Sequence, residues 1–83
     1  MSQRIGVIGI VVEDRGQAAA RINQILGEYA HLIVGRMGIP YRERKVSVIS
    51  LIIDGDTDEI GAMSGKLGNI KGVHVKSALV SKD

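Results

Sequence analysis

Two histidines and four clustered carboxylates are the side chains best suited to hold a metal ion. His31 and His74 are the only histidines, and the four acids are Asp54, Asp56, Asp58 and Glu59. Imidazole nitrogens would favour zinc or nickel, and clustered oxygens a hard divalent cation. The acids lack the spacing of a calcium loop, and they equally suit a helix start, where they cap free N–H groups. We expect neither a metal nor another cofactor, and His31 and His74 are the only metal candidates.

Groups that could perform catalysis do not gather around a nucleophile. The chain has no cysteine, and Ser47, Ser50 and Ser64 do not lie near a histidine in the sequence. The segment Gly65-Lys66-Leu67-Gly68 has the glycines of a phosphate-binding loop. However, Leu67 stands where that loop needs a hydroxyl, and the segment falls late in a predicted helix. The sequence therefore predicts a protein that is not an enzyme.

The loop Glu13-Asp14-Arg15-Gly16 is the best candidate for binding a small molecule. It joins a predicted strand to a predicted helix, and free N–H groups at a helix N-terminus attract an anion such as a carboxylate. Arg15 would add a charged donor, and Gly16 would leave room for the ligand. Asp14 is also a suitable N-cap, in which case the loop is a solvated turn. Both interpretations stay open.

Six elements must position these groups. Hydrophobic periodicity predicts them in the order strand, helix, strand, strand, helix, strand, at residues 4–12, 15–29, 31–37, 46–53, 56–70 and 73–80. A chain of 83 residues has room for one domain, residues 1–83. The order predicts an α+β ferredoxin-like (βαββαβ) fold, in which an antiparallel four-stranded sheet carries both helices on one face. The first and third strands are expected in the middle of the sheet.

Both faces of these two central strands are apolar, although an antiparallel sheet with helices on one side ordinarily shows a polar open face. We therefore expect another copy of the chain to cover the open face, in a homodimer or a homotetramer. The residues expected at this interface are Ile8, Ile10, Val12, Ile49 and Leu51.

Composition narrows the classes of partner. The formal net charge is +2, with acids and bases interspersed, so direct nucleic-acid binding is not expected. The apolar run at residues 5–12 is much shorter than the roughly 20 residues that span a bilayer, and it lacks a signal-peptide cleavage site. We expect no membrane association and a cytoplasmic location.

Four separated segments of the chain carry a family resemblance. They are Val11-Val12-Glu13-Asp14-Arg15, Arg36-Met37-Gly38-Ile39-Pro40, Ile60-Gly61-Ala62-Met63-Ser64-Gly65-Lys66-Leu67-Gly68 and Gly72-Val73-His74-Val75-Lys76. In sequence and spacing they resemble the small ACT-like regulators of the iron-only ([FeFe]) hydrogenase system. The resemblance implies a ferredoxin-like fold, related to ACT domains and to the C-terminal domain of nickel-responsive repressors, and an oligomer with a regulatory role.

Two functions follow from the resemblance and stay open. The first is an oligomeric regulatory or ligand-sensing module. ACT domains bind amino acids at the loop after their first strand, which implies an amino-acid-like effector at Glu13, Asp14, Arg15 and Gly16. The alternative is a protein-interaction module that docks onto a hydrogenase maturation or transcription partner without a small-molecule effector.

Overall fold

The computed structural model describes residues 3–13 and 18–81, so Asp14, Arg15 and Gly16 of the predicted ligand loop lie outside the described residues. The described elements are β1 (Gln3–Glu13), α1 (Ala18–Glu28), a 3-10 turn η1 (Ala30–Leu32), β2 (Ile33–Tyr41), a second 3-10 turn η2 (Arg42–Arg44), β3 (Val46–Asp56), α2 (Thr57–Gly68) and β4 (Val73–Ser81). The predicted order of strands and helices is confirmed.

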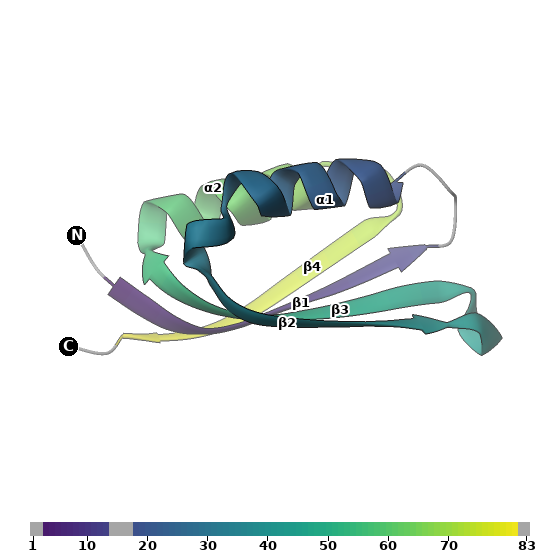
Figure 1. Ribbon diagram of the computed structural model, residues 1–83, viewed down its shortest axis with the longest axis horizontal. Helices are drawn as coiled ribbons and strands as arrows, with labels where there is room; N and C mark the ends of the chain where they lie inside the picture. Colours follow the sequence, from purple (N-terminus) through teal and green to yellow (C-terminus); the bar gives the residue numbers. More distant parts are fainter. Residues whose placement is uncertain (1–2, 14–17, 82–83) are drawn as a thin grey trace.

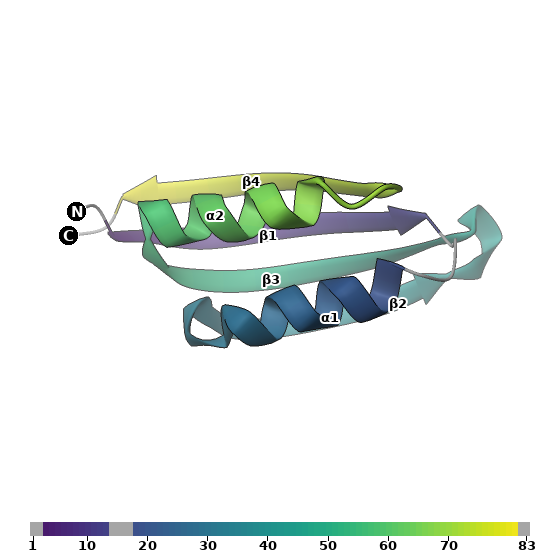
Figure 2. The same ribbon diagram turned by 90° about the horizontal axis from the view of Figure 1, so that it is seen from above.

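The four strands form one antiparallel sheet in the order β2-β3-β1-β4, with β1 and β3 in the middle as predicted. Both helices cover the same face of this sheet, with α2 near β4 and β1, and α1 over the β2 side (Figures 1 and 2). The β2–β3 hairpin extends beyond the helices (Figure 1). The ferredoxin-like fold is therefore confirmed.

The core lies between the helices and one face of the sheet. Alternate residues of β1 and β3 face the helices, and the apolar side chains of α1 and α2 pack on them. The largest fully buried side chains are Ile8, Ile10, Ile22, Ile25, Leu51, Ile53, Met63 and Leu67. Their aliphatic character is expected in a chain without phenylalanine or tryptophan.

The residues predicted for the subunit interface lie on the wrong face for that role. Ile8, Ile10 and Leu51 are fully buried and Val12 is nearly so, while Ile49 is partly buried against the same core. The two-residue period of a strand separates its faces but does not say which face the helices will cover. Any interface on the open face must use the alternate set of residues.

The clustered carboxylates begin α2. Asp56 is its N-cap, and its side-chain Oδ1 accepts a hydrogen bond from the backbone N–H of Asp58 at 2.7 Å. Asp58 and Glu59 lie in the first turn, where negative charge interacts favourably with the positive end of the helix dipole. The capping role predicted for Asp56 is confirmed.

Candidate functional site

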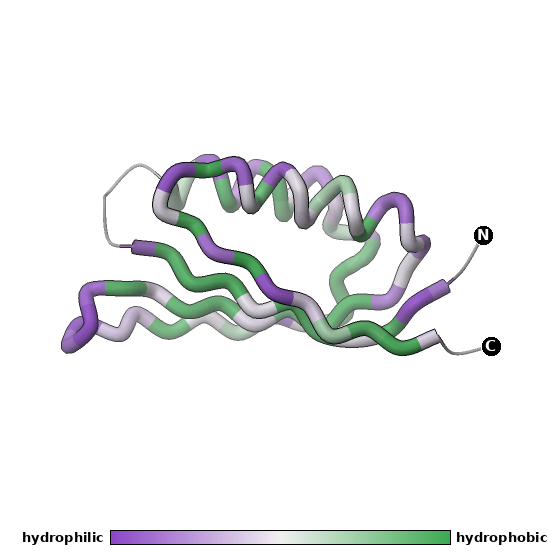
Figure 3. The backbone as a smooth tube through the Cα atoms, turned by 180° about the vertical axis from the view of Figure 1, so that it is seen from behind, coloured by the Kyte–Doolittle hydropathy of each residue, from purple (hydrophilic) through white to green (hydrophobic). Residues whose placement is uncertain are grey.

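The sheet face opposite the helices is largely apolar, and no described element covers it (Figure 1). Hydrophobic stretches run along the strands, and the tip of the β2–β3 hairpin is hydrophilic (Figure 3). We call this surface the open face. Its exposed large apolar side chains are Ile5, Val7, Val11, Met37, Ile39, Tyr41, Val48, Ile52 and Val80, each between 38% and 62% exposed. Exposed apolar residues that are grouped this closely usually mark a surface that binds a partner.

Strand register arranges the open face in rows across the sheet. In one row Val7 lies between Ile52 of β3 and Ala78 of β4, and in another Val11 lies between Val48 and His74. These rows bring apolar side chains of neighbouring strands into contact distance of one another.

The row between them has small residues at its centre, where Gly9 pairs with Ser50. A Cβ atom added at Gly9 would find a single neighbour within 4 Å, the carbonyl oxygen of Lys76 at 3.9 Å. The open face therefore has a shallow trough at Gly9 between two apolar rows.

The charged groups of the open face lie at its margins. Lys76 pairs with Gly9 from the edge strand β4, and Asp54 pairs with Ile5 toward one end of the sheet. An apolar centre with a polar rim is the usual anatomy of a protein–protein interface.

The two histidines lie at opposite ends of the sheet. His31 belongs to η1, and its Nε2 lies 2.8 Å from Oε2 of Glu59 at the start of α2. His74 is on β4, and its Nε2 lies 3.1 Å from Oε2 of Glu13 at the end of β1. Residues 3–13 and 18–81 contain no group of three or more histidines, cysteines or acids that could hold a metal ion. Each histidine thus contacts one carboxylate, and the structure does not bring the two histidines together.

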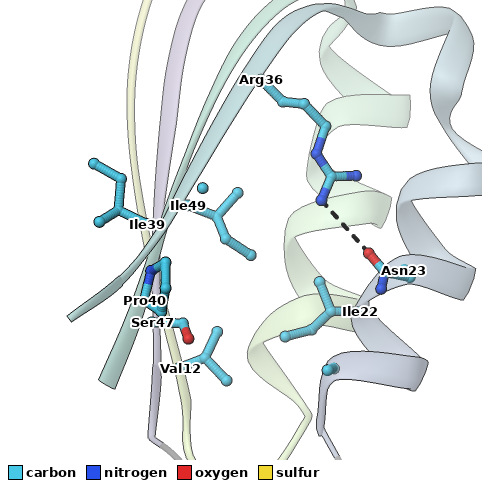
Figure 4. A pocket seen from close by; sticks show the side chains of 10 residues that line it. Val12, Ile22, Asn23, Arg36, Ile39, Pro40, Ser47 and Ile49 are labelled. Atoms are coloured by element: carbon cyan, nitrogen blue, oxygen red, sulfur yellow. Dashed lines mark hydrogen bonds between the residues drawn. The ribbon is translucent and has the colours of Figure 1, made fainter. Parts of the chain in front are cut away.

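A groove that sequence reasoning missed opens between α1 and the β2–β3 hairpin, with a volume of about 230 Å³ (Figure 4). We call it the α1–β2 groove. Arg36 of β2 crosses it toward Asn23 of α1, and its Nη2 lies 3.5 Å from Oδ1 of that side chain. Ile22 and Ile49 form apolar walls. The groove forms only when α1 packs over β2 and β3, so the spacing of residues along the chain carries no signal for it.

Family comparison agrees with this fold and with the motifs. Residues 4–77 match the model of the TM1266-like family, described as "Iron-only hydrogenase system regulator, putative". The chain belongs to this family. The resemblance identified from the sequence is therefore confirmed, and the family's description is that of a regulator.

Two solved structures resemble the chain to different degrees. The uncharacterized protein TM1266 from Thermotoga maritima is 42% identical, with a TM-score of 0.90 over 94% of this chain and 98% of that one. The apo form of CPII from Thiomonas intermedia K12, a nitrogen regulatory PII-like protein, is 12% identical, with a TM-score of 0.50 over 96% of this chain and 95% of that one. This second likeness concerns the fold alone. No curated protein matches the chain.

Among the described residues, neither helix has the length and the apolar character needed to cross a membrane.

Proposed function

We propose that the chain is a regulatory subunit of the iron-only hydrogenase system, and that it works as a homodimer formed through the open faces of two sheets. The observation that carries this proposal is the apolar centre of the open face, where Val7, Val11 and Ile52 are 38–49% exposed. Membership in a family of regulators supports the regulatory part of the proposal.

Two copies related by a two-fold axis would place the same surface against itself. Face-to-face sheets pack about 10 Å apart with interdigitated side chains, and the trough at Gly9 leaves room for a side chain from the facing copy. Lys76 lies on the edge strand, where it stays near water when the centre is covered. The distribution of charge therefore favours a second copy with the same apolar centre.

Burial of the centre supplies the driving force. A fully buried large aliphatic side chain is worth about 1.5–3 kcal/mol, and those of the open face have roughly half of that left to gain. Association itself costs about 4–15 kcal/mol, so several of these side chains must be buried together on each copy. The exposed apolar side chains of the open face lie on all four strands, so several of them can be buried at once.

Regulation through such a dimer needs a second state. A ligand or partner protein that binds the dimer and the single subunit with different affinity would shift the balance between them. The amino-acid-like effector at Glu13 to Gly16 and a hydrogenase maturation partner remain the two proposed agents of this shift.

Sedimentation velocity at micromolar concentration tests the dimer. We expect the wild-type chain to sediment as a dimer and the double variant Val7→Lys/Ile52→Lys to sediment as a monomer. The circular dichroism spectrum of the double variant should remain that of a folded protein. The control Ala20→Lys/Ala62→Lys adds the same two charges at exposed positions of α1 and α2 and should remain dimeric.

A wild-type chain that stays monomeric would contradict the dimer, and the open face would then be assigned to a different protein, as in the docking alternative. A double variant that remains dimeric would place the interface elsewhere on the molecule.

A further inference from the structure

The α1–β2 groove combines a cationic group with apolar walls. Arg36 supplies a guanidinium on one side, and Ile22 and Ile49 line the interior (Figure 4). Its volume of about 230 Å³ exceeds the roughly 150 Å³ of a cavity that holds benzene. It is smaller than the 300–1,000 Å³ typical of sites for drug-sized ligands. The groove therefore suits a molecule of a few carbon atoms.

Arg36 has donors to spare. A guanidinium carries five N–H donors in a planar fork, and the hydrogen bond to Asn23 is at the 3.5 Å limit of acceptable length. Among the described residues, no acidic oxygen lies within ion-pair distance of Arg36; the ion pairs found there involve His31, Lys66 and His74. A carboxylate from a ligand could accept two parallel hydrogen bonds from this fork.

Small residues keep the groove open. Gly38 of β2 and Ala19 of α1 both line it. A Cβ atom added at Gly38 would meet Cγ1 of Ile49 at 3.7 Å, which is an ordinary van der Waals distance. The backbone at Gly38 therefore has room for a Cβ atom, and the groove is open where Gly38 and Ala19 carry no larger side chain.

The charges of the lining select among carboxylates. Among the residues that the structure describes, Arg36 is the one charged residue that lines the groove, and no acid lines it. An α-amino acid would have to place its ammonium beside Arg36 without a negative partner, whereas a simple fatty acid has no such group.

We propose that the α1–β2 groove binds a short aliphatic monocarboxylate, with its carboxylate on Arg36 and its hydrocarbon chain on Ile22 and Ile49. Glu13, the part of the predicted ligand loop that the structure describes, does not line the groove. This site does not rest on the proposed dimer, because the groove lies on the helix side of the sheet.

Titration with 3-methylbutanoate, followed by two-dimensional ¹⁵N–¹H NMR on the full chain, tests the site. We expect saturable shifts at the amides of Ala19, Gly38 and Ser47. The neutral 3-methylbutanamide should cause none, and both acetate and the zwitterion leucine should bind more weakly than 3-methylbutanoate.

Three variants separate the site from general charge effects. Arg36→Gln should weaken binding about tenfold or more, since hydrogen bonds to charged groups are worth about 1.5–3 kcal/mol. Arg42→Gln removes the same charge from the exposed hairpin tip and should leave the affinity unchanged. Gly38→Val should fill the groove and abolish binding while the spectrum stays that of a folded protein.

Absence of saturable shifts with 3-methylbutanoate would overturn the proposal, and so would equal losses in Arg36→Gln and Arg42→Gln. Stronger binding of leucine or inorganic phosphate than of 3-methylbutanoate would also overturn it. The same titration of Val7→Lys/Ile52→Lys should give unchanged affinity, so failure of the dimer proposal and failure of the groove proposal are distinguishable.

Discussion

Replacement of Gly6 by alanine is expected to damage the sheet, although the change adds a single methyl group. Gly6 lies on central strand β1, paired with Leu79 of β4 and Ile53 of β3. A Cβ atom at this position would lie 2.9 Å from Cα of Leu79 and closer still to the carbonyl oxygen of Ala78. Both are backbone atoms, which cannot rotate out of the way as a side chain can. The strand β4 must therefore move away from β1 or lose pairing at this point.

The size of the effect follows from these contacts. Overpacking a tight site costs about 1–3 kcal/mol, and loss of one backbone hydrogen bond adds about 0.5–1.5 kcal/mol. We expect Gly6→Ala to lower the free energy of unfolding by about 3 kcal/mol. A domain of this size has in total about 4–12 kcal/mol at the usual value per residue. The melting temperature should fall by roughly 12–24 °C.

Gly9 on the same strand is the matched control. Its added Cβ atom would approach protein only at 3.9 Å, so Gly9→Ala should leave stability unchanged or raise it by up to about 1 kcal/mol through a less flexible unfolded chain. Both changes are made in the Val7→Lys/Ile52→Lys background, because Gly9 lies in the proposed dimer interface and dimerisation would add to the apparent stability. Urea unfolding and thermal melts then measure the difference between the two single subunits. If the two variants agreed within about 0.5 kcal/mol, the close approach of β4 to Gly6 would be refuted.

Three further predictions concern stability and titration. Gly55→Ala should destabilise less than Gly6→Ala, since its added Cβ atom meets the movable side-chain end of Leu32; urea unfolding measures the order. Asp56→Ala should cost about 1 kcal/mol in the same assay, through loss of the N-cap of α2. A hydrogen bond and charge interaction with Tyr29, followed by interactions with Glu28, raise the pKa of Lys66 above 10.5. The Lys66 ammonium therefore contributes favourably to the stability of the folded state. This contribution is complete below pH 10.5 and is lost as the pH rises through the higher pKa of the folded state. NMR titration of the Lys66 amine should give a lower pKa in Tyr29→Phe.

Each of these predictions has an outcome that contradicts it. A Gly55→Ala protein less stable than Gly6→Ala would mean that Leu32 is held rigidly. If Asp54→Ala, which leaves the cap intact, cost as much as Asp56→Ala, general charge would explain the loss. An unchanged Lys66 pKa in Tyr29→Phe would assign the shift to Glu28.

Much of the fold could be predicted from local patterns. The Val- and Ile-rich runs around Ile8 and Leu51 indicated the central strands, and Asp56 marked the start of α2. The boundary near His31 was less accurate, because residues 30–32 form a 3-10 turn before β2 begins at Ile33. Strand-forming composition does not distinguish such a turn from the strand that follows it.

The candidate sites were harder to predict. The sequence indicated that the sheet had an extra apolar face, but it assigned Ile8, Ile10 and Leu51 to that face instead of Val7 and Ile52. The α1–β2 groove was not predicted at all, since Arg36 and Asn23 are 13 residues apart and meet only through packing.

The amino-acid sequence by itself determined the order of strands and helices, their amphipathic periods and the excess of apolar surface, because these depend on residues close together in the chain. Tertiary structure alone decided which face of β1 is covered and why Gly6 and Gly9, identical as residues, differ in the space around them. Both depend on how β4 and the helices pack against β1, and packing joins segments whose distance in the chain leaves no local pattern.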